Sequence, residues 1–237
     1  MKKISQQAKS IYIGPNQRLW AMPRMYQRFW GWYELDQRSG LYFAKGSSAA
    51  NVSLIRNNFK RLPKLLQELC RNWSVTFSFA EGPTACGNSS TFYADFSRQP
   101  EQYISPHIEI GSASLSPERI LAHLGHEVCH LFWRSRSECE RRTYRAFLER
   151  SCQATSVEVT KYVHGYFEEY LESLKKFRQN KVHPNLHDGN FLRWTEESFC
   201  DTVATKLVGE HPDRTSNCSV DLAERVQEIE QSLQLAL

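Results

Sequence analysis

The spacing of apolar residues divides most of the chain into helical and extended stretches. Apolar residues recur at the helical period in several stretches, at residues 51–69, 116–132, 143–177, 195–208 and 219–233. Shorter stretches alternate or are continuously apolar in the manner of strands, at residues 75–79, 91–96 and 107–110. A helix, a small sheet and then mostly helices is the order of an α+β protein. The sequence therefore predicts a small mixed sheet packed on helices, with a mainly helical C-terminal half.

Prolines, glycines and charged residues set the expected limits of these elements. Pro63 is expected to kink or break the first helix. The long third stretch is expected to form either one long helix or two helices broken near residues 153–156. Residues 134–140 are highly charged and predict a solvated connection, and residues 181–190, which include a proline and a glycine, predict a loop.

The stretch at residues 195–208 has its own start and stop signals. Thr195 can act as an N-cap, which would place Glu196 and Glu197 in the first helical turn, where carboxylates suit the helix dipole. Gly209 is expected to end this helix. After a polar loop, Ser219 is expected to begin a terminal helix that packs on the rest of the chain.

The charge of the chain is unevenly distributed along its length. Residues 1–71 hold 13 Lys and Arg against 3 Asp and Glu, whereas residues 72–237 hold 17 against 23. Residues 1–46 also mix arginines with aromatic side chains, and the following Gly-Ser-Ser sequence predicts a boundary to a main domain at 47–237. Such a segment could bind single-stranded nucleic acid, pack on the main domain as short strands with solvated arginines, or dock on the acidic domain as an autoinhibitor.

Cysteine usage and hydropathy bear on the compartment of the protein. The seven cysteines are odd in number, scattered and without a C-x-x-C pair, a pattern typical of reduced cytosolic thiols rather than of a disulfide framework. The basic N-terminal residues are not followed by the apolar run of a signal peptide. No stretch of about 18 apolar residues is present. We therefore expect a cytoplasmic protein with no membrane partner.

One helical stretch carries a pattern suited to metal binding. His126, Glu127 and His130 form the sequence H-E-x-x-H. A spacing of four residues stacks the two imidazoles on one face of a helix, where both can bind one Zn²⁺ and the carboxylate can reach its water. Ser116 as the N-cap and Pro117 as the first helical residue support this helix. The alternative is an amphipathic core helix that happens to contain two histidines.

A second pair of carboxylates follows on a later helix. Glu197 and Asp201 spell E-x-x-x-D, so the two side chains stack one turn apart. A catalytic zinc site needs a third protein ligand, for which Glu197 is the first candidate. Its rivals are Glu138, Glu140, His183 and His187. The plain alternatives are a helix-dipole role for Glu197 and a surface position for Asp201.

The H-E-x-x-H sequence at 126–130, followed by Glu197-x-x-x-Asp201 on a later helix, resembles the gluzincin branch of zinc metallopeptidases. The string E-x-x-C-D on this later helix is also similar to the ligand helix of compact intracellular ImmA/IrrE-like proteases. The resemblance covers roughly residues 50–210 in element order and rests on these two motifs. It implies a zincin-like fold. The second motif follows at longer range than in the compact members, so residues 138–194 are expected to be a helical insertion.

The resemblance implies a role for each motif residue. His126, His130 and Glu197 would bind zinc. Glu127 would act as the general base, and Asp201 would orient a ligand histidine. Enzymes of this kind also need a donor to the transition state, which is a histidine, tyrosine or arginine. The candidates for this donor are His187, His211, Tyr162 and Tyr166.

These residues together predict a zinc-dependent endopeptidase acting on an intracellular protein. The zinc would activate a water, and Glu127 would take its proton and pass it to the leaving amine. The strand at 107–110 precedes the metal helix and is expected to be a cleft edge to which an extended peptide adds. The alternatives are a catalytically silent zinc-binding regulatory protein and a protease recruited to nucleic acid through residues 1–46.

Overall fold

The computed structural model describes residues 9–13, 31–80, 89–92, 106–111, 117–152, 155–179, 184–209 and 214–237. The chain divides into two compact units, Met1–Glu127 and Val128–Leu237. The first unit contains a mixed sheet with two helices after its third strand, and the second unit is helical. The described residues therefore form a mixed, mainly helical α+β structure, as the sequence predicts.

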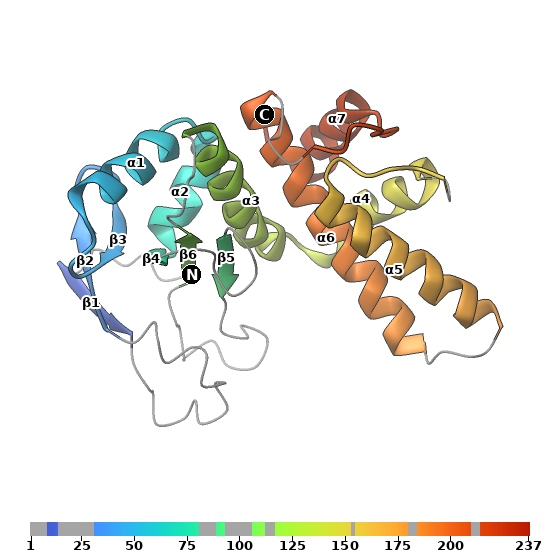
Figure 1. Ribbon diagram of the computed structural model, residues 1–237, viewed down its shortest axis with the longest axis horizontal. Helices are drawn as coiled ribbons and strands as arrows, with labels where there is room; N and C mark the ends of the chain where they lie inside the picture. Colours follow the sequence, from blue (N-terminus) through green and yellow to red (C-terminus); the bar gives the residue numbers. More distant parts are fainter. Residues whose placement is uncertain are drawn as a thin grey trace. The chain divides into compact units, whose positions relative to one another are not determined.

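A six-stranded sheet with the order β1-β2-β3-β4-β6-β5 lies in the first unit (Figure 1). Its strands are Ser10–Ile13 (β1), Gly31–Asp36 (β2), Leu41–Ala44 (β3), Thr76–Ala80 (β4), Ser89–Phe92 (β5) and His107–Gly111 (β6). β1, β2 and β3 are antiparallel, β3, β4 and β6 run parallel, and β5 is antiparallel to β6. The sequence predicts β4 and β6 to within a residue. β5 begins earlier than predicted, and residues 93–96 lie outside the described ranges.

The first three strands belong to the N-terminal segment at residues 1–46. Strand β3 pairs in parallel with β4 through Tyr42 opposite Thr76 and Phe43 opposite Phe77. These N-terminal strands therefore share one sheet with the strands that follow. The expected domain boundary at residue 46 stays a prediction.

Two helices lie on one side of this sheet (Figure 1). α1 (Ala49–Phe59) and α2 (Lys64–Asn72) are separated at Pro63, as predicted, because proline lacks the N–H that a continuing helix needs. Apolar side chains of the strands and the helices are buried together in this unit. They include Phe43, Ile55, Phe59, Leu66, Phe77, Ile108 and Ile110.

Strand β6 is an inner strand of the sheet. It pairs with β4 on one side and with β5 on the other, so both of its edges are already hydrogen-bonded. The prediction that this strand forms a cleft edge for an added peptide is therefore wrong. Among the described strands, β5 and β1 lie at the two ends of the sheet.

An ion pair joins the end of β2 to α1. Arg56 donates from Nε and Nη2 to the two carboxylate oxygens of Asp36, at 3.0 and 2.8 Å. Ser39 donates to the same carboxylate from its amide and its hydroxyl, at 3.1 and 2.6 Å. Burial raises the pKa of Asp36, but Arg56 and Ser39 outweigh this effect and hold the pKa below its ordinary value. The ionised carboxylate thereby fixes the β2–β3 turn against α1.

Helix α3 (Pro117–Ser135) is the predicted H-E-x-x-H helix, and it continues through the division between the two units at Glu127. Its expected N-cap, Ser116, lies outside the described residues. The predicted solvated connection at 134–140 is wrong, because α3 extends into it and α4 (Glu138–Ser151) begins within it. A capping box starts α4: the Ser137 hydroxyl accepts from the Glu140 amide at 3.3 Å, and the Glu140 carboxylate accepts from the Ser137 amide at 2.7 Å.

The next two helices, α5 (Lys161–Arg178) and α6 (Pro184–Val208), lie side by side and antiparallel (Figure 1). Of the two expectations for residues 143–177, the one of two helices broken near residues 153–156 is confirmed, since α4 ends at Ser151 and α5 begins at Lys161. The antiparallel direction follows from two hydrogen bonds, one between Tyr166 and Arg193 and one between Thr160 and Asp201. Residues nearer the start of α5 therefore lie beside residues nearer the end of α6.

Helix α6 begins earlier than the sequence predicts. Residues 184–190, expected to be a loop, are helical. Pro184 suits the first helical position because its φ is already that of a helix. A side chain at Gly189 would meet no heavy atom within 4 Å, so this glycine is not required by close packing. The predicted end of the helix at Gly209 is confirmed by its positive φ of 78°.

The early start of α6 changes the setting of the carboxylates. Thr195 is not an N-cap, because it lies inside the helix and donates its hydroxyl to the Leu192 carbonyl at 3.0 Å. Glu196 and Glu197 are therefore in the middle of a long helix and not in its first turn. A favourable interaction with the helix N-terminus consequently does not explain their presence.

Helix α7 (Leu222–Leu233) begins three positions after Ser219, the predicted first residue. Asp221 is its N-cap and accepts from the Glu224 amide at 3.1 Å. The Ser219 hydroxyl instead accepts from the Val157 amide at 2.8 Å. Among the described helices, none has a long enough apolar run to cross a membrane.

A buried ion pair ties α7 to α6 and to the segment before α5. Arg225 donates from its two terminal nitrogens to the two oxygens of Glu158, at 2.8 and 3.0 Å, and both side chains are almost fully buried. From α6, Trp194 Nε1 and the Ser198 hydroxyl donate to the same carboxylate at 2.9 and 3.4 Å. This network satisfies the buried charges and fixes α6 in the second unit.

We expect Asp36→Asn to lower the melting temperature at neutral pH, because the variant loses the charged partner of Arg56. The folded-state pKa of Asp36 lies below the unfolded value of about 3.9, so its contribution is present above about pH 4 and is lost as the pH falls through the folded-state pKa. Thermal unfolding of wild type and variant should therefore differ at pH 7 and converge in acid. Glu34→Gln on the same strand is the control. A constant difference at all pH values would contradict the assignment.

Replacing Arg225 by methionine should lower the free energy of unfolding by about 3–5 kcal/mol, because the Glu158 carboxylate would stay buried without its cation. The double variant Glu158→Gln with Arg225→Met removes both charges and should recover most of this loss. Urea unfolding of the three proteins measures the difference. Equal stability of the single and the double variant would show that the buried charge is not the cause.

Candidate metal centre

Helix α3 presents both histidines of the H-E-x-x-H motif on one face. His126 and His130 are four residues apart in a continuous helix, so their side chains stack one above the other. Both histidines are partly exposed, whereas only 4% of the surface of Glu127 is exposed. The opposite face of the helix is apolar, and its Leu124 and Val128 are fully buried. The amphipathic pattern of the helix thus directs its polar face, with the histidines, away from the core.

Glu197 of α6 joins the two histidines. Single ligand atoms of His126, His130 and Glu197 all lie within 4.8 Å of one another. His130 Nε2 lies 3.7 Å from Glu197 Oε2. This is the only group of three potential metal ligands found among the described residues.

The other nitrogen of His130 contacts a second carboxylate of α6. His130 Nδ1 lies 2.8 Å from Glu196 Oε1. Arg134, one turn after His130, donates from Nε to the same oxygen at 3.5 Å. Burial raises the pKa of Glu196, but the interactions with His130 and Arg134 outweigh it and leave the pKa below its ordinary value. An ionised Glu196 therefore accepts the Nδ1 proton of His130, which leaves Nε2 as the lone-pair nitrogen facing Glu197.

The distances and the donor set fit a zinc ion. In a tetrahedral zinc site with bonds near 2.1 Å, neighbouring ligand atoms stand about 3.4 Å apart. The 3.7 Å between His130 Nε2 and Glu197 Oε2 is close to this value, and a ligand atom of His126 lies within 4.8 Å of ligand atoms of both residues. Two imidazoles and one carboxylate form one of the ligand sets of catalytic zinc, which leaves a fourth position for water.

An aromatic cluster holds α6 against the C-terminal half of α3. Phe199, two residues after Glu197, stacks on Phe132 with ring centres 6.0 Å apart and contacts Trp133 at 5.2 Å. Tyr144 of α4 meets the edges of both Phe199 and Trp133 at 5.9 Å. Phe199 lies two residues after Glu197, and Phe132 and Trp133 lie two and three residues after His130. Because these rings are buried against one another, their packing fixes the rotation of α6 and its position along the helix axis relative to His130.

Asp201 lies one turn after Glu197 and is only 3% exposed, so the alternative that it is a surface carboxylate is wrong. It accepts a hydrogen bond from the hydroxyl of Thr160. Thr160 also caps α5, accepting from the Val163 amide at 3.3 Å. The expected contact of Asp201 with a ligand histidine stays a prediction.

Two tyrosines of α5 and an arginine of α6 form a chain of hydrogen bonds next to the carboxylates. Arg193 donates to the Tyr166 hydroxyl at 2.8 Å, and Tyr166 donates to the Tyr162 hydroxyl at 2.6 Å. Partial burial and the nearby Glu197 carboxylate raise the pKa of Tyr162, so this side chain keeps its proton at neutral pH. Tyr162 and Tyr166, both predicted as donor candidates, thus belong to one linked group.

The remaining candidates from the sequence fall into two groups. Glu138 pairs with Arg145 at 2.7 Å and Glu140 belongs to the capping box of α4, so both carboxylates have other partners. His183 and His211 lie outside the described residues, as do Arg18, Arg24 and Arg28 of the N-terminal segment. The backbone of His187 lies in α6, but its side chain is outside the described part of the chain.

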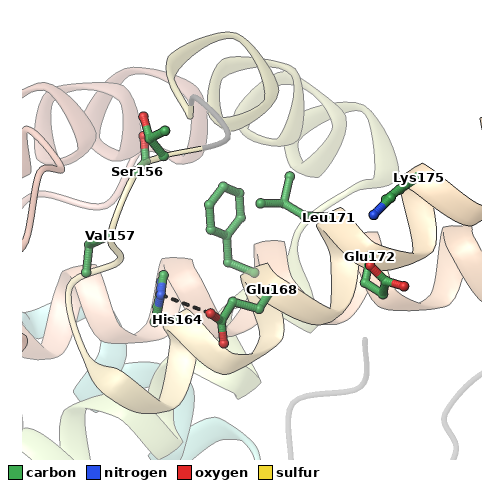
Figure 2. A pocket seen from close by; sticks show the side chains of 9 residues that line it. Ser156, Val157, His164, Glu168, Leu171, Glu172 and Lys175 are labelled. Carbon is green, nitrogen blue, oxygen red and sulfur yellow. Dashed lines mark ion pairs between the residues drawn. The ribbon is translucent and has the colours of Figure 1, made fainter.

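A hollow of about 400 Å³ lies on a face of α5 other than the face that carries Tyr162 (Figure 2). His164, Glu168 and Lys175 are among the residues that line it, and His164 Nε2 lies 3.6 Å from Glu168 Oε1. At about 100° per residue, His164 is turned by about 200° from Tyr162 around α5. This hollow therefore does not include the tyrosines or the candidate metal ligands.

Sequence reasoning missed Glu196, Arg193 and Thr160. The signal for Glu196 was its position beside Glu197, but adjacent residues on a helix point about 100° apart and only the placement of α3 decides between them. Arg193 precedes Glu197 by one turn, which indicates a shared face but not a tyrosine partner. No local pattern connects Thr160 with Asp201.

Comparison with protein-family models, curated proteins and solved structures gives no match to this chain. Its chemistry must therefore be inferred from the residues themselves.

Glu196→Gln should weaken zinc binding about 10-fold to 100-fold, because the neutral amide no longer fixes the proton and the orientation of His130. The dissociation constant can be measured by competition with a zinc chelator of known affinity. Asp188→Asn, an exposed carboxylate on the same helix, is the matched control and should bind as wild type. Unchanged affinity in Glu196→Gln would mean that Glu196 does not support a metal ligand.

Proposed function

We propose that the protein is a zinc-dependent endopeptidase of zincin-like fold. The observation that carries the proposal is the convergence of His126, His130 and Glu197 within 4.8 Å, with Glu127 next in sequence to the first ligand. The resemblance of the two sequence motifs to gluzincins implies the same three residues as ligands, without use of the structure. Agreement between an independent spatial grouping and a motif supports the proposal more than either does separately.

His126, His130 and Glu197 would hold the ion, and Glu196 would orient His130. When bound, zinc supplies Lewis acidity towards a carbonyl and a lowered pKa of its water. Glu127 would take a proton from the attacking water and pass it to the departing amine, as a general base and then a general acid. The near-complete burial of Glu127 limits its hydration, which favours proton transfer from a close neighbour over exchange with solvent.

An ion pair without metal is the plainest alternative for this cluster. A His130 protonated on both nitrogens could pair with Glu196 and Glu197 at the same time. In that arrangement the His126 ring would be a further hydrogen-bond donor in the same small volume. A metal ion explains all three residues at once, because it replaces the protons and binds both rings.

The reduced cytoplasmic setting and the intracellular substrate belong to the same proposal. They are supported by the scattered cysteines of the sequence. Recruitment by nucleic acid is a separate candidate. It is supported by Trp32, which is 54% exposed on β2, and by the exposed basic side chains of Lys45, Lys60 and Arg61 in the same unit.

Glu127→Gln should retain zinc and lose peptide cleavage by several orders of magnitude, because the amide cannot accept the proton. His126→Ala and Glu197→Ala should instead lose the metal. Metal content is measured by mass spectrometry of the purified proteins, and cleavage by mass spectrometry of a diverse peptide library. Glu149→Gln, an exposed residue of α4, is the control.

The outcomes separate the candidate functions. Zinc bound by the wild type with every library peptide intact would favour a catalytically silent zinc-binding protein. Near wild-type cleavage by Glu127→Gln would refute the assignment of the base. A wild type without bound zinc would leave the ion-pair alternative.

A further inference from the structure

A histidine and two hydroxyl side chains lie together on one face of the sheet in the first unit. In the parallel pair of β4 and β6, Thr76 lies opposite His107 and Ser78 lies opposite Glu109. Alternate residues of a strand share a face, so these four polar side chains project from the same face. The core residue Phe77, which lies between Thr76 and Ser78, projects from the other face. The proposed metal site uses none of the four polar residues.

The contacts of the His107 ring determine which of its nitrogens carries the proton. Nδ1 lies 2.9 Å from Thr76 Oγ1, and Nε2 lies 2.9 Å from Ser78 Oγ. The Thr76 hydroxyl also donates to the Pro106 carbonyl at 3.2 Å. A carbonyl oxygen only accepts, so for all three contacts to be hydrogen bonds the Thr76 oxygen must accept from Nδ1. Nε2 of the neutral ring then has a lone pair, and it accepts the Ser78 proton.

This arrangement combines a nucleophile, its base and a group that orients the base. A serine hydroxyl is a weak nucleophile until a base within hydrogen-bond reach can take its proton. The 2.9 Å between Ser78 Oγ and His107 Nε2 lies within that reach. Thr76 favours the tautomer of the ring whose Nε2 is free of a proton. The three residues therefore have the geometry of an activated serine.

The surroundings of the His107 ring support its role as a base. Tyr33 meets the edge of this ring with the ring centres 5.5 Å apart, which restricts its rotation. Glu109 lies two residues further along the same face and is only 4% exposed. Burial, and after it the charge of Glu109, raises the pKa of Tyr33, so the carboxylate lies near these rings. A carboxylate in this position would stabilise the positive charge that His107 gains with a proton.

The nucleophile is more accessible than its base. Thr76 and Phe77 are buried, whereas Ser78 and the last two residues of β4 are partly exposed. His107 itself is only 4% exposed. The Ser78 oxygen can therefore meet a substrate, while the ring that would receive its proton is shielded from most of the surrounding water.

We propose that Ser78 is a nucleophile that accepts an acyl group from activated carboxylic esters, with His107 as its general base and Thr76 as a positioning residue. Ser78 Oγ bonds to the acyl carbon while its proton passes to His107 Nε2. The ester C–O bond then breaks, and the same proton goes to the departing alcohol. A water molecule releases the acyl group as a carboxylic acid by the same steps, with His107 again as the base. This chemistry uses no metal ion and does not rest on the proposed function.

The test uses p-nitrophenyl acetate, an ester whose alcohol departs readily. The full-length protein is treated with EDTA first, so that the candidate metal centre does not contribute. We expect a burst of about one p-nitrophenol per protein and, by peptide mass spectrometry, an acetyl group on Ser78. Ser78→Ala should lose the burst. Ser10, an exposed serine of β1, is the internal control and should stay unmodified. A wild type without acetyl on Ser78 would overturn the inference.

Two further changes test the base and its orientation. His107→Gln should slow the acetylation of Ser78 about 100-fold or more, because an amide cannot take the proton. Thr76→Val removes the hydroxyl at similar volume and should slow the reaction about tenfold, as expected for one lost hydrogen bond. Thr76→Ser should restore the rate, because it restores the hydroxyl.

The Thr76 pair tests the assignment without changing the histidine, and melting temperatures show whether each variant is folded. A folded Thr76→Val or His107→Gln protein that is acetylated on Ser78 at the wild-type rate would overturn the inference. Neither result would affect the proposed function, whose test is zinc binding and peptide cleavage at the other site.

Discussion

The close packing of α6 on the C-terminal half of α3 is the constraint on which the candidate site depends. Phe199 fills the space beside Phe132 and Trp133, and these rings stand two or three residues from Glu197 and His130. A shift of α6 by one turn would move its carboxylates by about 5.4 Å, which exceeds the distances recorded in the site. The apolar contact therefore determines which polar groups meet, although it takes no part in their chemistry. The buried pair of Arg225 and Glu158 adds a second, polar restraint on the same helix.

Carboxylates flank both ring nitrogens of His130. Such an imidazole can satisfy its surroundings either with two protons or with one proton and one metal ion. Glu196 is the nearer carboxylate and determines which nitrogen carries the remaining proton. The candidate metal centre is thus also a site where protons and metal compete, and acid should favour the protons.

The sequence predicts well those features that depend on spacing within one element. The shared face of His126 and His130 follows from the helical period, and the break at Pro63 follows from its missing N–H. Both are independent of what surrounds the helix. The pairing order of the strands could not be predicted, because periodicity indicates that a segment is extended but not which strands lie beside it. The wrong prediction for β6 has the same cause.

Errors arose where a contact distant in sequence decides local structure. Residues 184–190 contain proline and glycine and are typical of a loop, but the helix that includes them is stabilised by Trp194 stacked on Tyr170 of α5, 5.0 Å away. The assignment of Thr195 as a cap failed for the same reason. The motif singled out Glu197, but the contact of Glu196 with the other nitrogen of His130 could not be predicted, because it depends on the position of α3 beside α6.

Helix α6 carries Arg193, Glu196, Glu197 and Asp201 within little more than two turns, and each of them contacts a residue on α3, on α5 or on the segment before α5. One residue inserted between Arg193 and Asp201 would rotate everything after it by about 100° and advance it by about 1.5 Å. No single compensating substitution could restore four such contacts together. Divergence in this stretch should therefore proceed by exchange of side chains at constant length, while length variation is confined to the connections between helices.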